Sequence, residues 1–156
     1  MERKTILSTC RKYRYCLWRE WDSANPAYAM FVGLNPSTAD ELKDDPTIRR
    51  CVNYAKDWGY GALCMVNLFA FRATEPSVMK AQAAPVGTMN DDWILKLAND
   101  AGVIIAAWGS HGTHLKRDEA VKKLLMNKLW YLKLTKDGAP GHPLYLKKTL
   151  KPIKFT

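Results

Sequence analysis

Four short segments of the chain combine glycine and proline with side chains that exchange hydrogen bonds or protons. They are GLNPS at 33–37, VNLFAF at 66–71, WGSHG at 108–112 and GHPLYL at 141–146. Asparagine amides both donate and accept hydrogen bonds, and histidine also transfers protons near neutral pH. Each segment lies at the end of an apolar run or one loop beyond it. If the fold brings them together, they would form a polar ligand site.

The strands that would position these segments are predicted from short apolar runs, which are typical of buried strands. Four such runs occupy residues 28–34, 62–69, 103–108 and 129–134. Residues 13–21 mix aromatic and arginine side chains in rough alternation, a pattern that favours an edge strand.

Helical segments alternate with these strands. Asp45 is predicted to cap a helix whose first residue is Pro46 and which stops at Gly59. Four more helices are predicted. The first two begin at Thr74–Pro76 and at Thr88 or Asn90. The third spans 113–126 and points Leu115, Val121, Leu124 and Leu125 inward, and the last is a short helix around 144–148.

Strands that alternate with helices predict a mostly parallel sheet covered on both faces. We therefore expect one domain over residues 1–156, an α/β/α sandwich of three layers. Its four-stranded, mostly parallel sheet would carry an extra N-terminal edge strand. Such sheets bind ligands beyond the carboxyl ends of their strands, where the four polar segments are predicted to converge.

Composition narrows the class of protein. A chain of 156 residues suits one compact domain, and its net charge of +9 favours an anionic partner such as nucleic acid or a nucleotide. Solvated basic ends would produce the same charge. No apolar run is long enough to span a membrane, and the N-terminus lacks the apolar core of a secretion signal. We expect a cytoplasmic protein with no membrane partner.

The four cysteines show no CxxC spacing, and no histidine lies near them in the sequence. This pattern does not favour a zinc site, and buried free thiols are the expected state. We expect no metal and no cofactor. The oligomeric state and any protein partner are left open.

Each polar segment also has a purely structural interpretation. Asn35 could be an ordinary turn residue, and Asn67 could be a buried amide whose hydrogen bonds are satisfied within the protein. Trp108 and Gly109 could be core followed by a tight turn, and His142 with its proline could begin a helix. The coincidence of all four at one predicted edge of the sheet favours a binding site.

In this order the four segments resemble the motifs of the uracil-DNA glycosylase superfamily. GLNPS resembles the first motif of its mismatch-specific branch, Gly-x-Asn-Pro-Gly/Ser, and GHPLYL is similar to the His-Pro motif before the DNA-penetrating loop. MVNLFAF resembles the strand whose terminal asparagine reads the base, and AAWGSHG the strand that ends in Trp-Gly-Ser. From about residue 13 to 146 the chain is also similar to a bacterial and phage family, domain of unknown function 1643. The resemblance implies a uracil-DNA glycosylase-like fold.

The glycosylase resemblance implies hydrolysis of an N-glycosidic bond in DNA or in a nucleotide, modified or not. Asn35 would position the attacking water, and His142 would donate a hydrogen bond to the oxygen where the charge of the departing base develops. Asn67 would read the edge of the base, and Phe69 or Phe71 would stack on it. The other substrate-binding positions implied by the motifs are Gly33, Pro36, Ser37, Trp108, Gly109 and Tyr145.

The chain departs from the glycosylase pattern in the first motif, which lacks the Asp-Pro-Tyr of the strongly catalytic enzymes. The amide of Asn35 is no strong base, so catalysis would depend on positioning and electrostatics. One of Asp40, Asp44 and Asp45 could supply a base, or Asp45 could be only a helix cap with the other two solvated.

Two further sets of side chains could contact a nucleic acid. Arg49 and Arg50 lie in the first turns of the helix that Asp45 caps and could grip a phosphate, although arginines are common on helix surfaces. Leu144, Tyr145 or Leu146 could fill the gap that a flipped base leaves.

Three functions therefore remain open. The first is the N-glycosidic hydrolase. The second is a module that binds a nucleotide or nucleotide signal in the same pocket without cleaving it. The third is a protein-binding module whose basic surface docks on an acidic partner.

Overall fold

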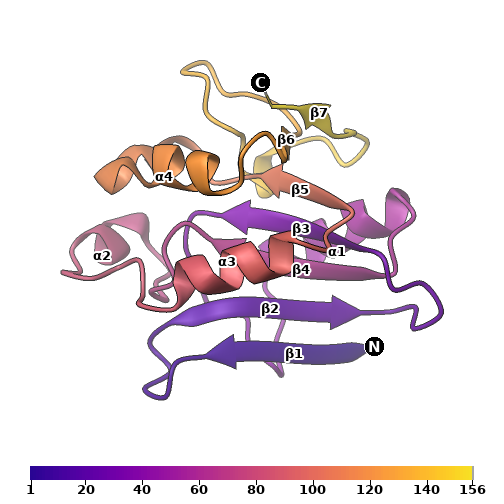
Figure 1. Cartoon of the computed structure of the whole chain (residues 1–156), viewed down its shortest axis with the longest axis horizontal. Helices are drawn as coiled ribbons and strands as arrows, with labels where there is room; N and C mark the ends of the chain where they lie inside the picture. Colours follow the sequence, from indigo (N-terminus) through magenta and orange to yellow (C-terminus); the bar gives the residue numbers. More distant parts are fainter. Residues whose placement is uncertain (156) are drawn as a thin grey trace.

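The structure is a computed structural model that describes residues 1–155, and its centre is a mixed sheet of seven strands (Figure 1). The strand order is β1-β2-β4-β3-β5-β6-β7. Neighbours within β4-β3-β5-β6 pair in parallel, whereas β1, β2 and β7 join antiparallel at the two sides. The strands are Glu2–Leu7 (β1), Arg14–Glu20 (β2), Tyr28–Gly33 (β3), Ala62–Asn67 (β4), Val103–Ala106 (β5), Leu129–Tyr131 (β6) and Ile153–Lys154 (β7). The predicted α/β class is confirmed, and the sheet is larger than the predicted one.

The N-terminal strand was expected at the edge of the sheet, and this prediction is wrong. Strand β2 lies inside the sheet, paired with β1 on one side and β4 on the other. Its residues are mostly buried. The sequence did not indicate this burial, because arginine is usually an exposed residue. The edge strand is β1, whose first three residues are exposed, so it carries no apolar run that would predict a strand.

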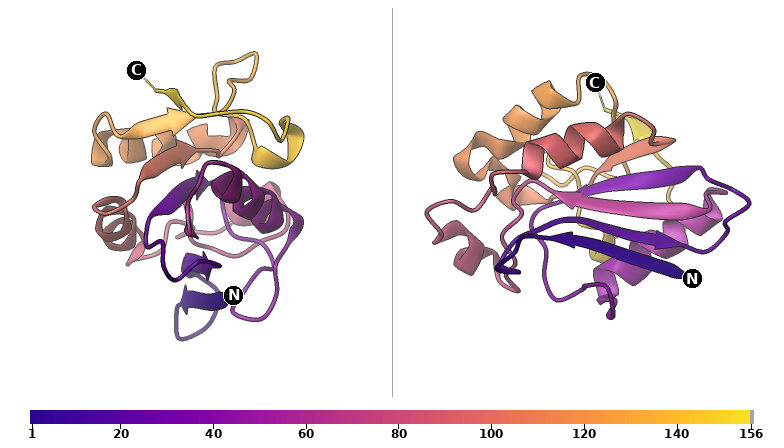
Figure 2. Two further views of the ribbon diagram at one scale, coloured as in Figure 1. Left: turned by 90° about the vertical axis from the view of Figure 1, so that its right-hand side faces the viewer. Right: turned by 60° about the horizontal axis from the view of Figure 1, so that its bottom comes forward.

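Helices cover both faces of the sheet, as the edge-on view in Figure 2 shows. Helix α1 (Pro46–Asp57) packs Ile48, Val52 and Ala55 against one face. Helices α3 (Asn90–Ala98) and α4 (Arg117–Leu124) pack Ile94 and Val121 against the other. The short α2 (Pro76–Lys80) adds Met79 to that second cluster.

Local capping rules predicted α1 correctly. The side chain of Asp45 accepts a hydrogen bond from the Ile48 N–H at 2.9 Å, and Pro46 is the first helical residue. Because the first N–H groups of a helix have no partner within it, this bond fixes where α1 begins.

Three other helix predictions need correction. The cap of α3 is Met89, and Asn90 uses its side-chain amide to donate to the backbone oxygens of Asn67 and Leu68. The predicted helix 113–126 is a 3-10 segment, Ser110–Lys116 (η1), followed by α4. Leu115 has a φ of 52° and is exposed, not inward. The final helix is a 3-10 turn, Pro143–Tyr145 (η2).

All four cysteines are free. Cys16, Cys51 and Cys64 are buried as predicted, whereas Cys10 is exposed, so the prediction of burial is wrong for that residue. Within the described residues no helix has the length and apolar character needed to cross a membrane.

Arg19 fixes the loop that leads into α1. Its side chain is fully buried and donates to Asp44 Oδ1 at 2.8 Å and to the backbone oxygens of Asp40 and Lys43. A loop held to β2 by these bonds delivers Asp45 and the start of α1 to a fixed place.

We expect Arg19→Met to lower the free energy of unfolding by about 3 kcal/mol, because the substitution removes the buried guanidinium and leaves its hydrogen-bond acceptors without a donor. Chemical denaturation measures this. Arg3 contacts the same Asp44 carboxylate at 3.6 Å but is 36% exposed, so Arg3→Met is the matched control, with an expected change below about 0.5 kcal/mol. Equal losses for the two variants would contradict the assignment.

Candidate functional site

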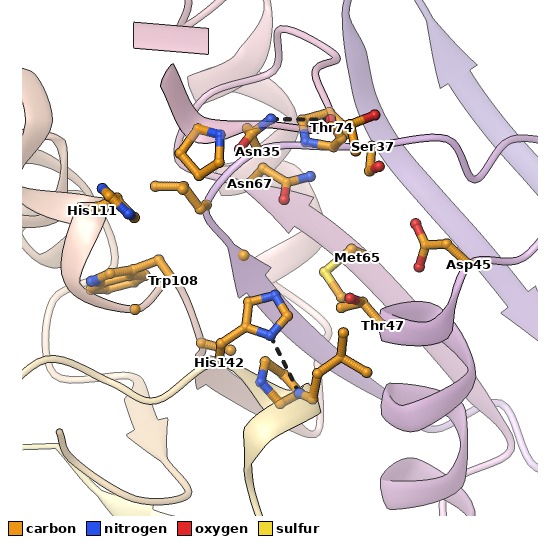
Figure 3. Close-up of a pocket in the computed structure, with 18 of the residues that line it drawn as sticks. Asn35, Ser37, Asp45, Thr47, Met65, Asn67, Thr74, Trp108, His111 and His142 are labelled. Atoms are coloured by element: carbon orange, nitrogen blue, oxygen red, sulfur yellow. Dashed lines mark hydrogen bonds between the residues drawn. The ribbon is translucent and has the colours of Figure 1, made fainter. Parts of the chain in front are cut away.

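A pocket of about 790 Å³ opens at the carboxyl ends of the parallel strands (Figure 3). Residues that follow β3, β4 and β5 line it, together with the loop after β6 and the first turn of α1. Its volume lies within the range of small-molecule sites in proteins. The structure thus brings together the four polar segments that the sequence places far apart.

Asn35 contributes a fixed amide to this pocket. Its Nδ2 donates to the Ala73 oxygen at 2.8 Å and to the Pro36 oxygen at 3.2 Å. Within residues 1–155 its Oδ1 receives no hydrogen bond. The amide is therefore held by its nitrogen, and its oxygen is left as an acceptor for a ligand or a water.

Asn67 lies in the middle of the pocket, between Asn35 and His142 (Figure 3). It ends β4 opposite Gly33 of β3, and a Cβ at Gly33 would come within 2.7 Å of Asn67 Oδ1. Glycine at this position thus makes room for the asparagine side chain.

The amide nitrogen of Asn67 is a buried donor without a partner. The residue is 3% exposed, and no described residue accepts a hydrogen bond from its Nδ2. A buried unsatisfied donor costs about 1–3 kcal/mol relative to a satisfied one. A ligand acceptor in the pocket would remove this penalty.

His142 presents one ring nitrogen to the pocket and binds the backbone with the other. Its Nδ1 accepts from the Leu144 N–H at 3.3 Å. This bond requires an unprotonated Nδ1, so the neutral ring carries its proton on Nε2, which faces the pocket interior (Figure 3). Burial lowers the pKa of His142, and the nearby charge of Asp45 opposes this effect only in part. The site therefore holds a neutral imidazole whose Nε2–H is available to a ligand acceptor.

The structure separates the predicted site residues into two groups. Three of them, Phe69, Arg49 and Arg50, lie outside the pocket lining. The other predicted site residues all line the pocket: Gly33, Asn35, Pro36, Ser37, Asn67, Trp108, Gly109, His142 and Tyr145.

The aromatic platform predicted after β4 is not in the pocket. Phe69 is fully buried in the core and its ring lies 5.5 Å from that of His114. Phe71 contacts Tyr13 edge-on instead. Of the residues proposed to replace a flipped base, Leu144 and Tyr145 line the pocket and are exposed, and Leu146 is not among the lining residues.

Arg50 positions the His142 segment rather than a phosphate. It donates to the backbone oxygens of Pro143 and Leu146, and Tyr54 one turn later donates to that of Lys147. Arg49 is exposed and reaches the backbone oxygen of Asp44 at 3.5 Å. One side of α1 is thus a row of donors that fixes the loop carrying His142.

Sequence reasoning missed several lining residues. Arg14 lines the pocket and is 2% exposed, whereas the pattern of residues 13–21 predicts an edge strand. Asp45, for which the sequence leaves the roles of base and helix cap open, lines the pocket as well. Five further lining residues are Met65, Thr47, Thr74, His111 and Thr135. Met65 and His111 belong to the segments MVNLFAF and WGSHG, where they have no predicted role, and no motif identifies the three threonines.

Arg14 brings a buried cation to the pocket. Its Nη1 donates to the Ala39 oxygen at 3.0 Å, and its Nε has no partner within the described chain. Burial lowers the pKa of Arg14 to about 10, and the charge of Asp45 acts in the opposite direction. The guanidinium is therefore still charged at neutral pH.

The described residues contain no group of three or more His, Cys, Asp or Glu side chains placed to hold a metal ion.

Comparison with known proteins yields one family. Residues 14–144 match the family model described as "Protein of unknown function (DUF1643)", which confirms the family expected from the sequence. Neither a search of curated proteins nor a search of solved structures found a match.

The lowered pKa of His142 predicts a measurable dependence of stability on pH. Between the folded pKa and the unfolded value of about 6.5, the unfolded chain binds the proton more readily, so stability falls as pH falls. We expect wild type to lose more free energy of unfolding from about pH 8 to about pH 5 than His142→Gln does. Denaturant titrations at the two pH values measure both losses. An equal or larger loss in the variant would contradict burial of a neutral ring.

Proposed function

The chain belongs to the DUF1643 family of proteins of unknown function, and we propose an activity for it on the basis of the residues that line its pocket. The pocket recognises a nucleobase and hydrolyses the N-glycosidic bond that joins it to a sugar, in DNA or in a nucleotide. The order of the four lining segments along the chain supports a relationship to the uracil-DNA glycosylase superfamily.

The observation that carries this proposal is the unpartnered amide of Asn67. A side chain with one buried free donor and an adjacent acceptor matches the alternating donors and acceptors on the edge of a nucleobase. The apolar surfaces of Met65 and Trp108 border the same space, and a planar ring can lie against them. The net charge of +9 is consistent with a phosphorylated substrate.

His142 supplies the stabilisation that bond cleavage needs. When the C1′–N bond breaks, its electron pair leaves with the base, and negative charge develops on the base oxygens. A neutral imidazole whose Nε2–H faces the pocket donates to such an oxygen without first giving up a proton. Asn35 Oδ1 accepts from a water and orients it toward the sugar.

A second candidate is a binding module that retains the pocket without the chemistry. The observation that favours it is Asn35 itself, because an amide holds a water but cannot take up its proton at neutral pH. The two candidates share the ligand and differ in whether the base is released.

The test is incubation of the purified protein with nucleosides, nucleotides and DNA that carry uracil, mismatched thymine or modified bases. Mass spectrometry then identifies any free base. We expect release by wild type, a loss of about 10²-fold in kcat for His142→Gln, and a loss of at least about tenfold for Asn35→Ala. For Asn67→Ala we expect weaker substrate binding by about tenfold, equal to one lost hydrogen bond.

Asn53→Ala is the matched control, because Asn53 is an exposed asparagine of α1 outside the pocket lining. It should behave as wild type does. Saturable binding with the ligand recovered intact would select the binding module. Neither release nor binding across the whole substrate set would reject both candidates.

A further inference from the structure

We infer that Asp45 is the general base that activates the hydrolytic water. The inference rests on the proposed function and adds to it the proton acceptor that the amide of Asn35 cannot provide. Three structural observations point to Asp45: one of its oxygens is held by α1 while the other has no partner, its charge acts on the other groups of the pocket, and the neighbouring acids are engaged elsewhere or not held in place.

The two carboxylate oxygens of Asp45 are not equivalent. Oδ1 accepts the hydrogen bond from the Ile48 N–H that caps α1. Oδ2 accepts none from residues 1–155, and no Lys, Arg or His nitrogen of those residues lies within 4.0 Å of the carboxylate. The side chain lines the pocket and points from the start of α1 toward its interior (Figure 3). One oxygen thus fixes the carboxylate, and the other is available to a water.

Asp45 is also the negative charge to which the other ionisable groups around it respond. Burial lowers the pKa of Arg14 from β2 and of His142 from the loop before η2, and the charge of Asp45 opposes that lowering in both cases. It also contributes to the raised pKa of Cys51 on α1, where burial is the larger cause. A carboxylate whose field reaches both sides of the pocket would also favour positive charge that develops on a bound sugar.

The neighbouring acids are engaged in other contacts. Asp44 pairs with Arg19 at 2.8 Å, and Asp40 Oδ1 accepts from the Leu42 and Lys43 N–H groups, which lower the pKa of Asp40. Glu75 also lines the pocket, but it is exposed and its side chain makes no capping bond to α2. Among the acids that line the pocket, Asp45 is the one whose side chain is held by a hydrogen bond.

Hydrolysis at this site proceeds by cleavage of the C1′–N bond and attack of a water on C1′. The C1′–N bond breaks and its electrons leave with the base, whose oxygen accepts the hydrogen bond from His142 Nε2. The water oxygen bonds to C1′, and one of its protons passes to Asp45 Oδ2. Asp45 then returns the proton to solvent and the base anion takes one up, so the net change is the addition of one water across the bond.

The test uses two substitutions that keep the helix cap. Asparagine and glycine are both accepted at N-cap positions, so Asp45→Asn and Asp45→Gly leave α1 intact but remove the base. We expect Asp45→Asn to lower kcat for base release by about 10²-fold with KM unchanged. In Asp45→Gly, added formate fits the space left by the carboxylate, and we expect it to restore a large part of kcat. A purely structural role would not respond to formate.

Asp57→Asn is the matched control, because Asp57 is an exposed aspartate at the other end of the same helix. A kcat of Asp45→Asn equal to that of wild type would overturn the inference and leave the proposed function standing. So would an inactive Asp45→Gly that formate does not restore. If wild type releases no base from any substrate, the proposed function fails first, and the role of Asp45 fails with it.

Discussion

Strand β3 pairs in parallel with β4 on one side and with β5 on the other, and the pocket depends on this arrangement. The register places Gly33 opposite Asn67 and Val32 opposite Ala106. The backbone N–H groups of Leu68 and Phe69 then bond to the oxygens of Gly33 and Leu34 beyond the strand ends. Because parallel strands end at the same edge, three separate stretches of chain present Asn35, Asn67 and Trp108 at one level. A shift of one residue in either pairing would turn these side chains to the opposite faces of the sheet.

Several buried polar side chains bind the loops around the pocket, although Asn90 Oδ1 and Thr5 Oγ1, outside the pocket lining, have no partner among the described residues. Arg117 donates to the Leu68 oxygen and to Asp91, Arg19 donates to a loop and to Asp44, and the amide nitrogen of Asn90 donates to two backbone oxygens. These side chains stabilise the loops around the pocket. Asn67 Nδ2 and Arg14 Nε, by contrast, are buried donors of pocket residues with no partner in the described chain. Asn67 ends β4 and Arg14 begins the antiparallel β2, so both donors lie at the same edge of the sheet, where a ligand in the pocket can use them.

Much of this arrangement could be predicted from local sequence rules, and the failures have physical causes. Apolar runs identified the four parallel strands, and Asp45-Pro46 identified the start of α1, since both signals depend on neighbouring residues alone. Strands β1 and β7 carry exposed residues without an apolar pattern, so they escaped detection. Phe69 was predicted at the site because the sequence VNLFAF does not say which side chains turn inward after β4 ends. Arg14 and Arg50 were misjudged because the charge of an arginine gives no indication of which backbone oxygens it will meet.

If the Asn67 amide recognises a nucleobase, its side-chain NMR signals must respond when a base binds. In a titration of the ¹⁵N-labelled protein with free bases and nucleosides, the account predicts a saturable shift of the Asn67 Nδ2–H resonances for at least one base, while those of the exposed Asn53 and Asn99 stay unchanged. Asn67→Ala identifies the signals by their disappearance. Asn67 resonances that do not move with any base, or shifts confined to the exposed amides, would contradict the account.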